Sequence, residues 1–339
     1  MTFAPGAFPW QGWPRMAKHL EMLIGALNGT VGDYLKRTGN GLATPMELVH
    51  AGSPLAVTRD AIAAVHPAAT PRAVVLVHGL MSTEHVFELP DGETYATLLA
   101  RDLGFTPFAV RYNSGLHVSD NGEALDDLLE RLAAAHPVPL EEIALIGHSM
   151  GGLVIRSATH AASGRGRRWL PLARRAFYVG SPHLGAPLER AGNVLAWALA
   201  KVGIPTTDLI ADIVNLRSSG VKDLRYGNLR REDWEGGDPD ALLQNRRHPV
   251  PLLPEIRHHL IAGTLVDDPL VSMLFGDAVV PLPSAAGQAR PKHRSALFPA
   301  EHVRVLAGFD HVRLAHDLQV YAHIRAWCEE ELRCDACVA

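Results

Sequence analysis

A serine in a glycine-rich turn is the side chain of this sequence best placed for nucleophilic chemistry. Ser149 lies in Gly147–Gly152 (GHSMGG), after the apolar run 143–146 and before the helical pattern 153–157. A strand, a sharp turn and a helix in this order expose the serine oxygen, and small residues on both sides allow close packing. The next backbone N–H, that of Met150, then lies at a helix N-terminus, where it stabilises a developing oxyanion. The pattern therefore predicts a nucleophile for acyl transfer.

A second donor for the oxyanion is expected from a loop after an earlier strand. The β-branched run 73–77 leads directly into His78–Met81 (HGLM). The glycine of this loop lets the backbone approach the nucleophile, so we assign the N–H of Leu80 as the partner of the Met150 N–H. His78 ends a strand beside a glycine, and we interpret it as a structural residue bonded to neighbouring backbone.

A serine hydroxyl needs a histidine base to take its proton. The chain has 18 histidines, so closeness to a motif says little and position along the chain must decide. His311 lies in the loop directly after the last predicted strand, 303–306, and is the expected base. His302 precedes that strand, and His316 falls in the predicted last helix. Asp310 is expected to cap or pair locally, because adjacent side chains rarely face each other.

The base in turn needs an orienting carboxylate, which in this order of residues lies between the serine and the histidine. Asp277 is the preferred acid, because it lies in a loop after the predicted strand near residue 260. Asp267 and Asp268 lie nearer the end of that strand and are its rivals. A solvated turn aspartate with no catalytic role is the alternative for Asp277.

These strings resemble those of α/β-hydrolase lipases and esterases, over roughly residues 71–327. The resemblance rests on the His-Gly-Leu loop, the GHSMGG turn and the string Gly180–Gly185 (GSPHLG). The last string is similar to the Pro-His-x-Gly segment of bacterial lipases and of lipase-like proteins related to glycosylphosphatidylinositol inositol-deacylases, which implies that His183 supports the wall of the site. The string around Asp277 is similar to a Gly-Asp-Gly-x-Val-Pro segment, with Ala278 where a glycine is common.

The elements that must position these residues follow an alternating pattern from residue 72 onwards. Continuous apolar runs are typical of strands buried on both faces, and they alternate with amphipathic helical patterns. The predicted strands are 73–77, 106–111, 142–146, 176–179, 259–261 and 303–306, and the predicted helices are 94–103, 120–135, 151–161 and 317–331. The alternation predicts a doubly wound, mostly parallel sheet, and the resemblance implies an α/β-hydrolase fold with an inserted helical cap.

The domain organisation is predicted from where this alternation holds. A hydrolase core is expected over 71–185 and 256–332, and a tail over 333–339. Residues 1–70 are expected to add a helix (15–38) and a hairpin (46–49 with 55–57), as a packed brace by default. A dimer arm and a membrane-surface helix are the alternatives for this extension.

The stretch 186–255 interrupts the alternation and is interpreted as a cap. Its segment 193–202 is apolar nearly all round, so such a helix must be buried or cover an apolar site. Three of its side chains are expected to bind the acyl or alcohol part of a substrate: Leu195, Trp197 and Leu199. A packed accessory helix without substrate contact is the alternative.

Composition excludes several classes of protein. The 339 residues include 47% hydrophobic and 20% charged residues with a net charge of −4, which argues against long disorder and a basic nucleic-acid surface. The three cysteines (Cys328, Cys334, Cys337) are odd in number and lie late in the chain, which argues against a disulfide framework. No phosphate loop or paired metal ligands occur, so neither cofactor nor metal is expected.

The sequence thus predicts a serine hydrolase that cleaves small-molecule or lipid carboxylic esters, an esterase or lipase. Phospholipase, lactonase or amidase activity on the same triad is an alternative. A non-catalytic binding or scaffold protein that retains the fold is an alternative of another class. The longest apolar stretch, 194–200, is too short for a bilayer and the start does not read as a signal peptide, so a soluble cytoplasmic protein is expected, of open oligomeric state.

Overall fold

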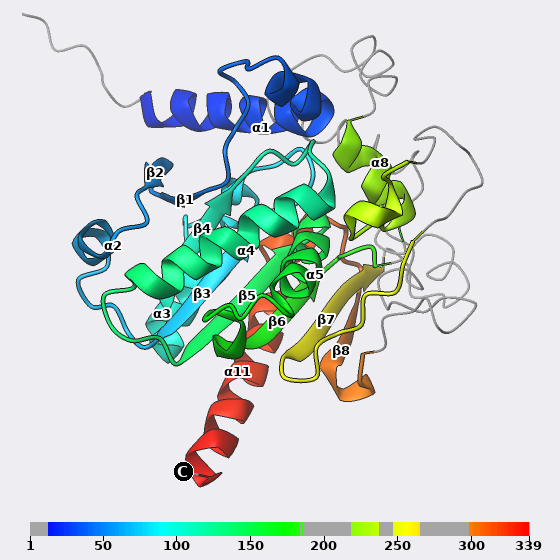
Figure 1. Ribbon diagram of the computed structural model, residues 1–339. Helices are drawn as coiled ribbons and strands as arrows, with labels where there is room; N and C mark the ends of the chain where they lie inside the picture. The colour runs from blue at the N-terminus through cyan, green and yellow to red at the C-terminus, as the bar shows by residue number, and fades with distance from the viewer. Residues whose placement is uncertain (1–12, 184, 186–217, 237–246, 265–297, 339) are drawn as a thin grey trace, which may run out of the picture.

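The computed structural model describes residues 13–183, 185, 218–236, 247–264 and 298–338. Within this part of the chain, eight strands form one sheet in the order β2-β1-β4-β3-β5-β6-β7-β8 (Figure 1). The strands are β1 (Glu47–His50), β2 (Ser53–Leu55), β3 (Arg72–Val77), β4 (Thr106–Arg111), β5 (Glu142–His148), β6 (Ala173–Val179), β7 (Arg257–Thr264) and β8 (Val303–Ala307). All strands from β4 to β8 in this order run parallel, whereas β1 is antiparallel to both of its neighbours.

Helices cover both faces of the sheet, because the central strands are apolar on both faces. On β3, Ala73, Val75 and Val77 face one core cluster, which also contains residues of α4 (Val118–Ala135) and α5 (Met150–Ala162). Val74 and Leu76 face the other cluster, with residues of α3 (Tyr95–Leu103) and α11 (Leu318–Val338). This two-sided burial is what a doubly wound parallel sheet requires, and it confirms the predicted fold class.

The ends of several elements follow from local capping chemistry. Thr94 caps α3 in a reciprocal pair with Thr97, and Gly104 ends the helix in a left-handed conformation. Each strand and helix predicted within the alternating pattern is present, with ends that differ by a few residues, whereas the helix expected over 193–202 lies outside the described residues. His316 was expected inside the last helix, which is wrong. The Asp317 side chain accepts a hydrogen bond from the Gln319 N–H (2.8 Å), and α11 begins only at Leu318.

The N-terminal part of the chain is built into the same body. Helix α1 (Trp13–Arg37) lies across one end of the molecule, and its backbone is non-helical at Val31. The predicted hairpin is present as β1 and β2, with its second strand two residues earlier than expected, and β1 pairs with β4 in the main sheet. A short helix, α2 (Arg59–Val65), which the sequence pattern did not indicate, connects the hairpin to β3.

Part of the segment interpreted as a cap lies within the described residues. It forms helix α8 (Ser219–Tyr226), which begins at the capping residue Ser218 and ends at Gly227 in a left-handed conformation. Val221 and Leu224 of this helix belong to the core cluster of α4 and α5. The Ser218 hydroxyl donates to the Gly29 carbonyl of α1 (2.7 Å), so α8 joins α1 to the core. Leu195, Trp197 and Leu199 lie outside the described residues.

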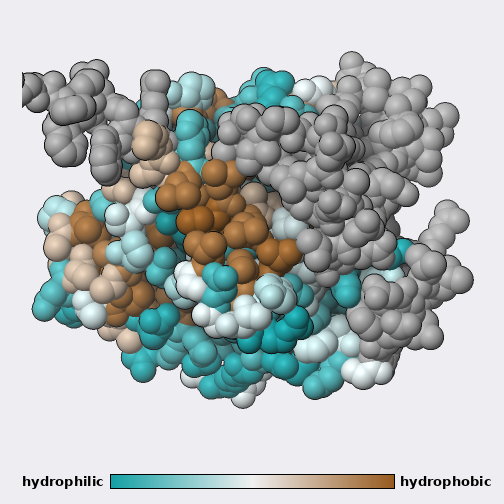
Figure 2. Space-filling view, turned by 90° about the horizontal axis from the view of Figure 1, so that it is seen from above, coloured by the Kyte–Doolittle hydropathy of each residue, from teal (hydrophilic) through white to brown (hydrophobic). Residues whose placement is uncertain are grey.

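Helix α1 exposes several large apolar side chains. Met16, Leu20 and Leu27 are exposed along this helix, at 67%, 58% and 38% of their full areas. Figure 2 looks down on this end of the molecule and shows hydrophobic side chains gathered there. No helix in the described part of the chain is both long enough and apolar enough to cross a membrane.

Candidate active site

The turn between β5 and α5 holds Ser149 in a strained backbone conformation. Its φ and ψ are 54° and −123°, a region that residues with a side chain rarely adopt. The Ser149 N–H donates to the Val179 carbonyl of the neighbouring strand (2.8 Å). Strain of this kind costs on the order of 1–3 kcal/mol and persists only where the surroundings enforce it. The predicted sharp turn is therefore present, with the serine at its apex.

Two glycines make this turn possible. A Cβ atom on Gly147 would lie 2.6 Å from the backbone nitrogen of Gly152, which lies in the first turn of α5. A Cβ atom on Gly151 would lie 2.5 Å from the carbonyl oxygen of His78 and still closer to that of Val77. Because no side chain fits these gaps, glycine at both positions lets α5 approach β5 and β3.

The loop after β3 runs directly beside the serine. A Cβ atom on Gly79 would lie 2.9 Å from the Cβ of Ser149, so only glycine fits at this crossing. Leu80 and Met81, which follow, are buried, and Met81 has a φ of 57°. The Met81 N–H donates to the hydroxyl of Ser114 (3.0 Å), which fixes the far end of the loop.

His78 fixes the orientation of the peptide that was predicted to bind the oxyanion. Its Nε2 accepts a hydrogen bond from the Tyr112 N–H (3.3 Å), so its Nδ1 carries the proton and donates to the Gly79 carbonyl (2.8 Å). In a trans peptide the C=O and N–H point in opposite directions. The N–H of Leu80 consequently points away from His78. The predicted structural role of His78 is confirmed by these bonds to backbone.

Burial keeps the ring of His78 uncharged. Desolvation lowers its pKa to about 4, with the hydrogen bond to Gly79 opposing the shift. The ring also stacks on Tyr112 at 4.3 Å between centroids, and the Tyr112 hydroxyl donates to the His78 carbonyl (2.8 Å). A neutral ring with both nitrogens engaged is suited to hold a loop and unsuited to act as a base.

His311, the predicted base, is itself buried and lies in a loop next to the turn between β5 and α5 that holds Ser149, called the elbow below. The loop follows β8, and the N–H groups of Gly308 and Phe309 both donate to the carbonyl of Thr264 at the end of β7 (2.6 and 3.1 Å). The carbonyl of His311 accepts a hydrogen bond from Nε2 of His148 (2.8 Å), and the two rings are 4.8 Å apart. The tertiary structure thus brings the histidine loop to the residue that precedes the nucleophile.

Asp310 has the local role that its position suggested. It is exposed, and its carboxylate accepts hydrogen bonds from the N–H groups of Val312 and Arg313 (2.9 and 2.8 Å). These bonds cap the turn that carries His311. Asp277, with its rivals Asp267 and Asp268, lies outside the described residues.

His148 is a site residue that the sequence pattern did not single out. Burial lowers its pKa well below the usual value, and the neighbouring His311 lowers it further. It therefore remains neutral and carries its proton on Nε2, the atom that donates to His311. In the sequence, the only sign of a role for His148 is its position inside GHSMGG. The general pattern Gly-x-Ser-x-Gly accepts any residue at that position.

His183 is buried in the wall beside α5, where its Nδ1 accepts a hydrogen bond from the guanidinium of Arg156 (3.2 Å). Its ring contacts Tyr178 and Phe298 edge-on or tilted, with centroids 5.0 and 5.1 Å away. Burial and then the charge of Arg156 lower its pKa well below the usual value. This neutral, packed ring suits the supporting role that the resemblance implied.

One group of described side chains, on α1 and on the segment that follows the loop after β3, has the donor types of a metal site. Glu21, Glu84 and His85 place three ligand atoms within 4.8 Å of one another. The guanidinium of Arg111 already bonds both carboxylates, and its Nε lies 2.9 Å from Glu84. The arrangement is therefore explained as an ion network, with the positive charge of Arg111 in the place that a cation would take.

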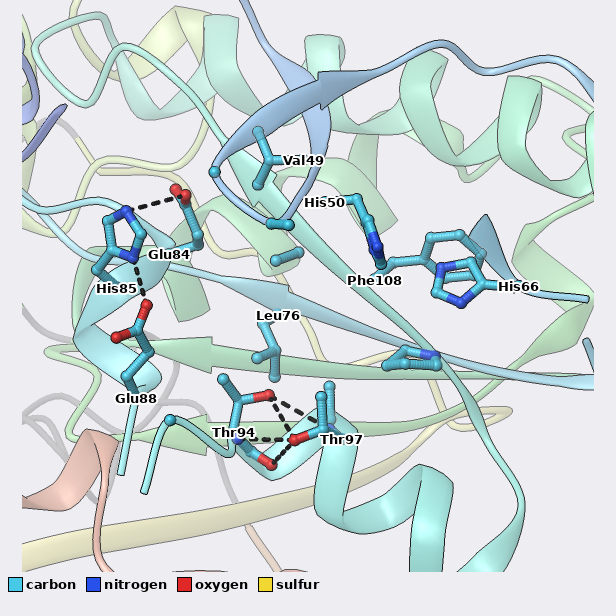
Figure 3. A pocket seen from close by; sticks show the side chains of 16 residues that line it. Val49, His50, His66, Leu76, Glu84, His85, Glu88, Thr94, Thr97 and Phe108 are labelled. Carbon is cyan, nitrogen blue, oxygen red and sulfur yellow. Dashed lines mark hydrogen bonds and ion pairs between the residues drawn. The ribbon is translucent and has the colours of Figure 1, made fainter. Parts of the chain in front are cut away.

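This network borders a cavity of about 300 Å³ between β1, β4 and α3. Figure 3 shows His85 pointing between Glu84 and Glu88 at one end, with Leu76 near the centre and His66 beyond it. Neither Ser149 nor His311 lines this cavity, so it belongs to the α3 face of the sheet and not to the elbow.

We predict that His148 contributes to the rate by holding the His311 loop. Replacing it by phenylalanine removes the donor to the His311 carbonyl, and kcat for an activated ester should fall about 10- to 100-fold with little change in KM. His148→Gln, which retains a side-chain N–H, should recover part of the loss. A fully active His148→Phe enzyme would contradict this role.

No protein-family model and no curated protein sequence matches the chain. Among solved structures, it is similar to the mature lipase BlEst2 of Bacillus licheniformis, at 17% identity and a TM-score of 0.48, over 76% of this chain and 91% of the lipase. It is similar to an esterase of Pyrococcus furiosus at 14% identity and a TM-score of 0.44, over 77% and 82% of the two chains. The NocB thioesterase domain shows 15% identity and a TM-score of 0.43, over 84% and 99%.

Three features of the chain's own backbone identify its fold. A glycine loop follows β3, a serine elbow follows β5 and a histidine loop follows β8, all at the carboxyl edge of one mostly parallel sheet. A strained serine between a buried strand and a helix, beside a loop from an earlier strand, is the defining arrangement of one architecture. The chain has the α/β-hydrolase fold.

Proposed function

We propose that this chain is a serine hydrolase that cleaves carboxylic esters through an acyl-enzyme. One observation carries the proposal: Ser149 is held at a φ of 54° directly beside the Gly79–Leu80 peptide. That peptide is oriented by a neutral histidine, as an oxyanion donor must be before reaction begins. The histidine loop joined to the elbow through His148 supplies the base.

Each residue has a defined step in this proposal. The Oγ of Ser149 attacks the acyl carbon while His311 takes the hydroxyl proton, and the N–H groups of Leu80 and Met150 bind the oxyanion. The tetrahedral adduct collapses, the alcohol leaves with the proton from His311, and the acyl group stays on the serine. Water then attacks the acyl-enzyme with His311 as the base again, which releases the acid and restores the serine. Asp277 orients and stabilises the imidazolium.

The same residues serve phospholipase, lactonase and amidase chemistry, because each of these reactions passes through an acyl-enzyme and an oxyanion. Esters are preferred here because an alcohol leaves more readily than an amine. A scaffold protein without catalysis has no use for a strained serine and an oriented oxyanion peptide. A non-catalytic scaffold protein would be indicated if a serine-directed reagent failed to label the folded chain.

The nucleophile is tested by covalent labelling. A fluorophosphonate should add one mass increment to the folded protein, and the increment should be absent from Ser149→Ala, because the reagent bonds the activated serine oxygen. Mass spectrometry of the intact protein measures this, and peptide mapping places the label. A folded wild-type protein that remains unlabelled would contradict the proposal.

The acid is tested by comparing three aspartates. Asp277→Asn should lower kcat about 10³- to 10⁴-fold, because the histidine then loses its orienting carboxylate. Asp267→Asn and Asp268→Asn should each stay within about threefold of the wild type, since they are not expected to reach His311. Should one of these two variants lose its activity while Asp277→Asn keeps it, the acid would be reassigned.

The proposed acyl-binding role of segment 193–202 is tested with p-nitrophenyl esters of increasing chain length. Trp197→Ala should shift the preferred acyl chain to longer esters, with kcat/KM ratios between chain lengths changing about tenfold, because removal of an indole opens space in an apolar pocket. Lys201→Ala, a polar position of the same segment, is the matched control. Identical chain-length profiles for both variants and the wild type would favour a packed accessory helix.

A further inference from the structure

The loop after β3 that carries Leu80 and Met81, called the oxyanion loop below, packs directly on helix α1. The face of α1 that it contacts carries glycines. A Cβ atom on Gly29 would lie 2.6 Å from both the Cα and the nitrogen of Met81. One turn earlier, a Cβ on Gly25 would lie 2.6 Å from the Thr83 Cγ2 and 2.9 Å from the Ser82 carbonyl oxygen. Backbone of α1 and backbone of the loop therefore touch without an intervening side chain, so any shift of one displaces the other.

The next glycine of this face, Gly32, holds the segment that anchors the loop from its other side. A Cβ on Gly32 would lie 2.6 Å from the Cγ of Asn113, whose amide donates to the Gly32 carbonyl (2.9 Å). The adjacent Ser114 accepts the hydrogen bond from the Met81 N–H (3.0 Å). Met81 thus lies between α1 and the segment of Asn113 and Ser114, which α1 also holds in place.

Charged groups tie the same helix to the residues that follow the loop. Glu21 of α1 accepts hydrogen bonds from Nε2 of His85 (2.8 Å) and from the guanidinium of Arg111 (2.9 Å). Lys18 pairs with Glu88, and Figure 3 shows Glu88 bonded in turn to His85. The side chains of His85 and Arg111 are only 10% and 12% exposed, so water and salt screen this network weakly.

We propose that Gly29 and Glu21 are positioning residues of the oxyanion hole, and that α1 sets where the Leu80 N–H lies. The inference rests on the proposed function, which assigns that N–H to the oxyanion. Met81, the next residue, is held at a φ of 57°, a conformation that needs support from its surroundings. Because oxyanion donors act within a few tenths of an ångström, a displaced Met81 weakens binding of the transition state more than binding of the ester.

The test is Gly29→Ala, in which the new methyl group must push Met81 away. We expect kcat to fall about 10- to 100-fold while KM stays within about threefold. The inhibition constant of an alkyl boronic acid should rise by the same factor as kcat/KM falls, since its serine adduct carries the oxyanion. Gly41→Ala is the matched control and should leave all three constants unchanged, because a Cβ there meets no atom within 4 Å.

Two variants of Glu21 test the same inference if Gly29→Ala does not fold. Glu21→Ala should lower kcat and weaken boronate binding together, by about three- to tenfold, and Glu21→Gln should recover part of both, because its amide oxygen still accepts a hydrogen bond. All measurements are made at a temperature at which circular dichroism shows each variant to be folded.

The outcomes separate this inference from the function on which it rests. Folded variants with wild-type kcat and boronate affinity, even with a lowered melting temperature, would show a merely structural helix and overturn the inference alone. A wild-type protein that neither hydrolyses esters nor reacts with a fluorophosphonate would overturn the proposed function and this inference with it. Parallel losses in kcat and boronate affinity at constant KM support it.

Discussion

Three segments of backbone meet at Ser149 with no room for a side chain between them, and the rest of the site depends on this crossing. The end of β5, the start of α5 and the loop after β3 approach so closely that Gly147, Gly151 and Gly79 have no room for a Cβ. Packing of this density leaves the serine one conformation, with a positive φ that would not persist in a free chain. The energy that enforces the turn comes from the two cores on the faces of the sheet.

Four histidines of the candidate site differ in the hydrogen bonds that they make, and these bonds indicate their roles. His78, His148 and His183 are buried, each has a pKa well below that of a free histidine, and each makes a hydrogen bond that fixes its tautomer. Such rings hold backbone or side chains in place and do not exchange protons near neutral pH. His311 lies on a loop after the last strand, its carbonyl accepts the hydrogen bond from His148, and the proposed mechanism assigns proton transfer to its ring.

Helices from the two irregular parts of the chain complete the structure above the sheet. Helix α1 contacts the oxyanion loop through glycines, and α8 is fastened to α1 by Ser218 and by Ser219, whose N–H and hydroxyl both bond Asp33 (3.2 and 3.1 Å). The N–H of Gly220 also donates to the Gly115 carbonyl (3.0 Å), next to the serine that holds Met81. Helices α1 and α8, which lie outside the alternating pattern, therefore support one side of the proposed oxyanion hole.

Local patterns in the sequence predicted the strands and helices of the alternating part, the serine elbow and the glycine loop. Apolar runs, helical periodicity and a glycine turn are local signals, readable within ten or so residues. The hydrogen bond from His148 to the carbonyl of His311, 163 positions away, and the close packing of Gly29 against Met81 became visible only in the folded chain. Helices α2 and α8 are short, and packing rather than periodicity supports them. Contacts between distant segments depend on how the helices and strands cross in space. The spacing of residues within a local motif does not reveal that geometry.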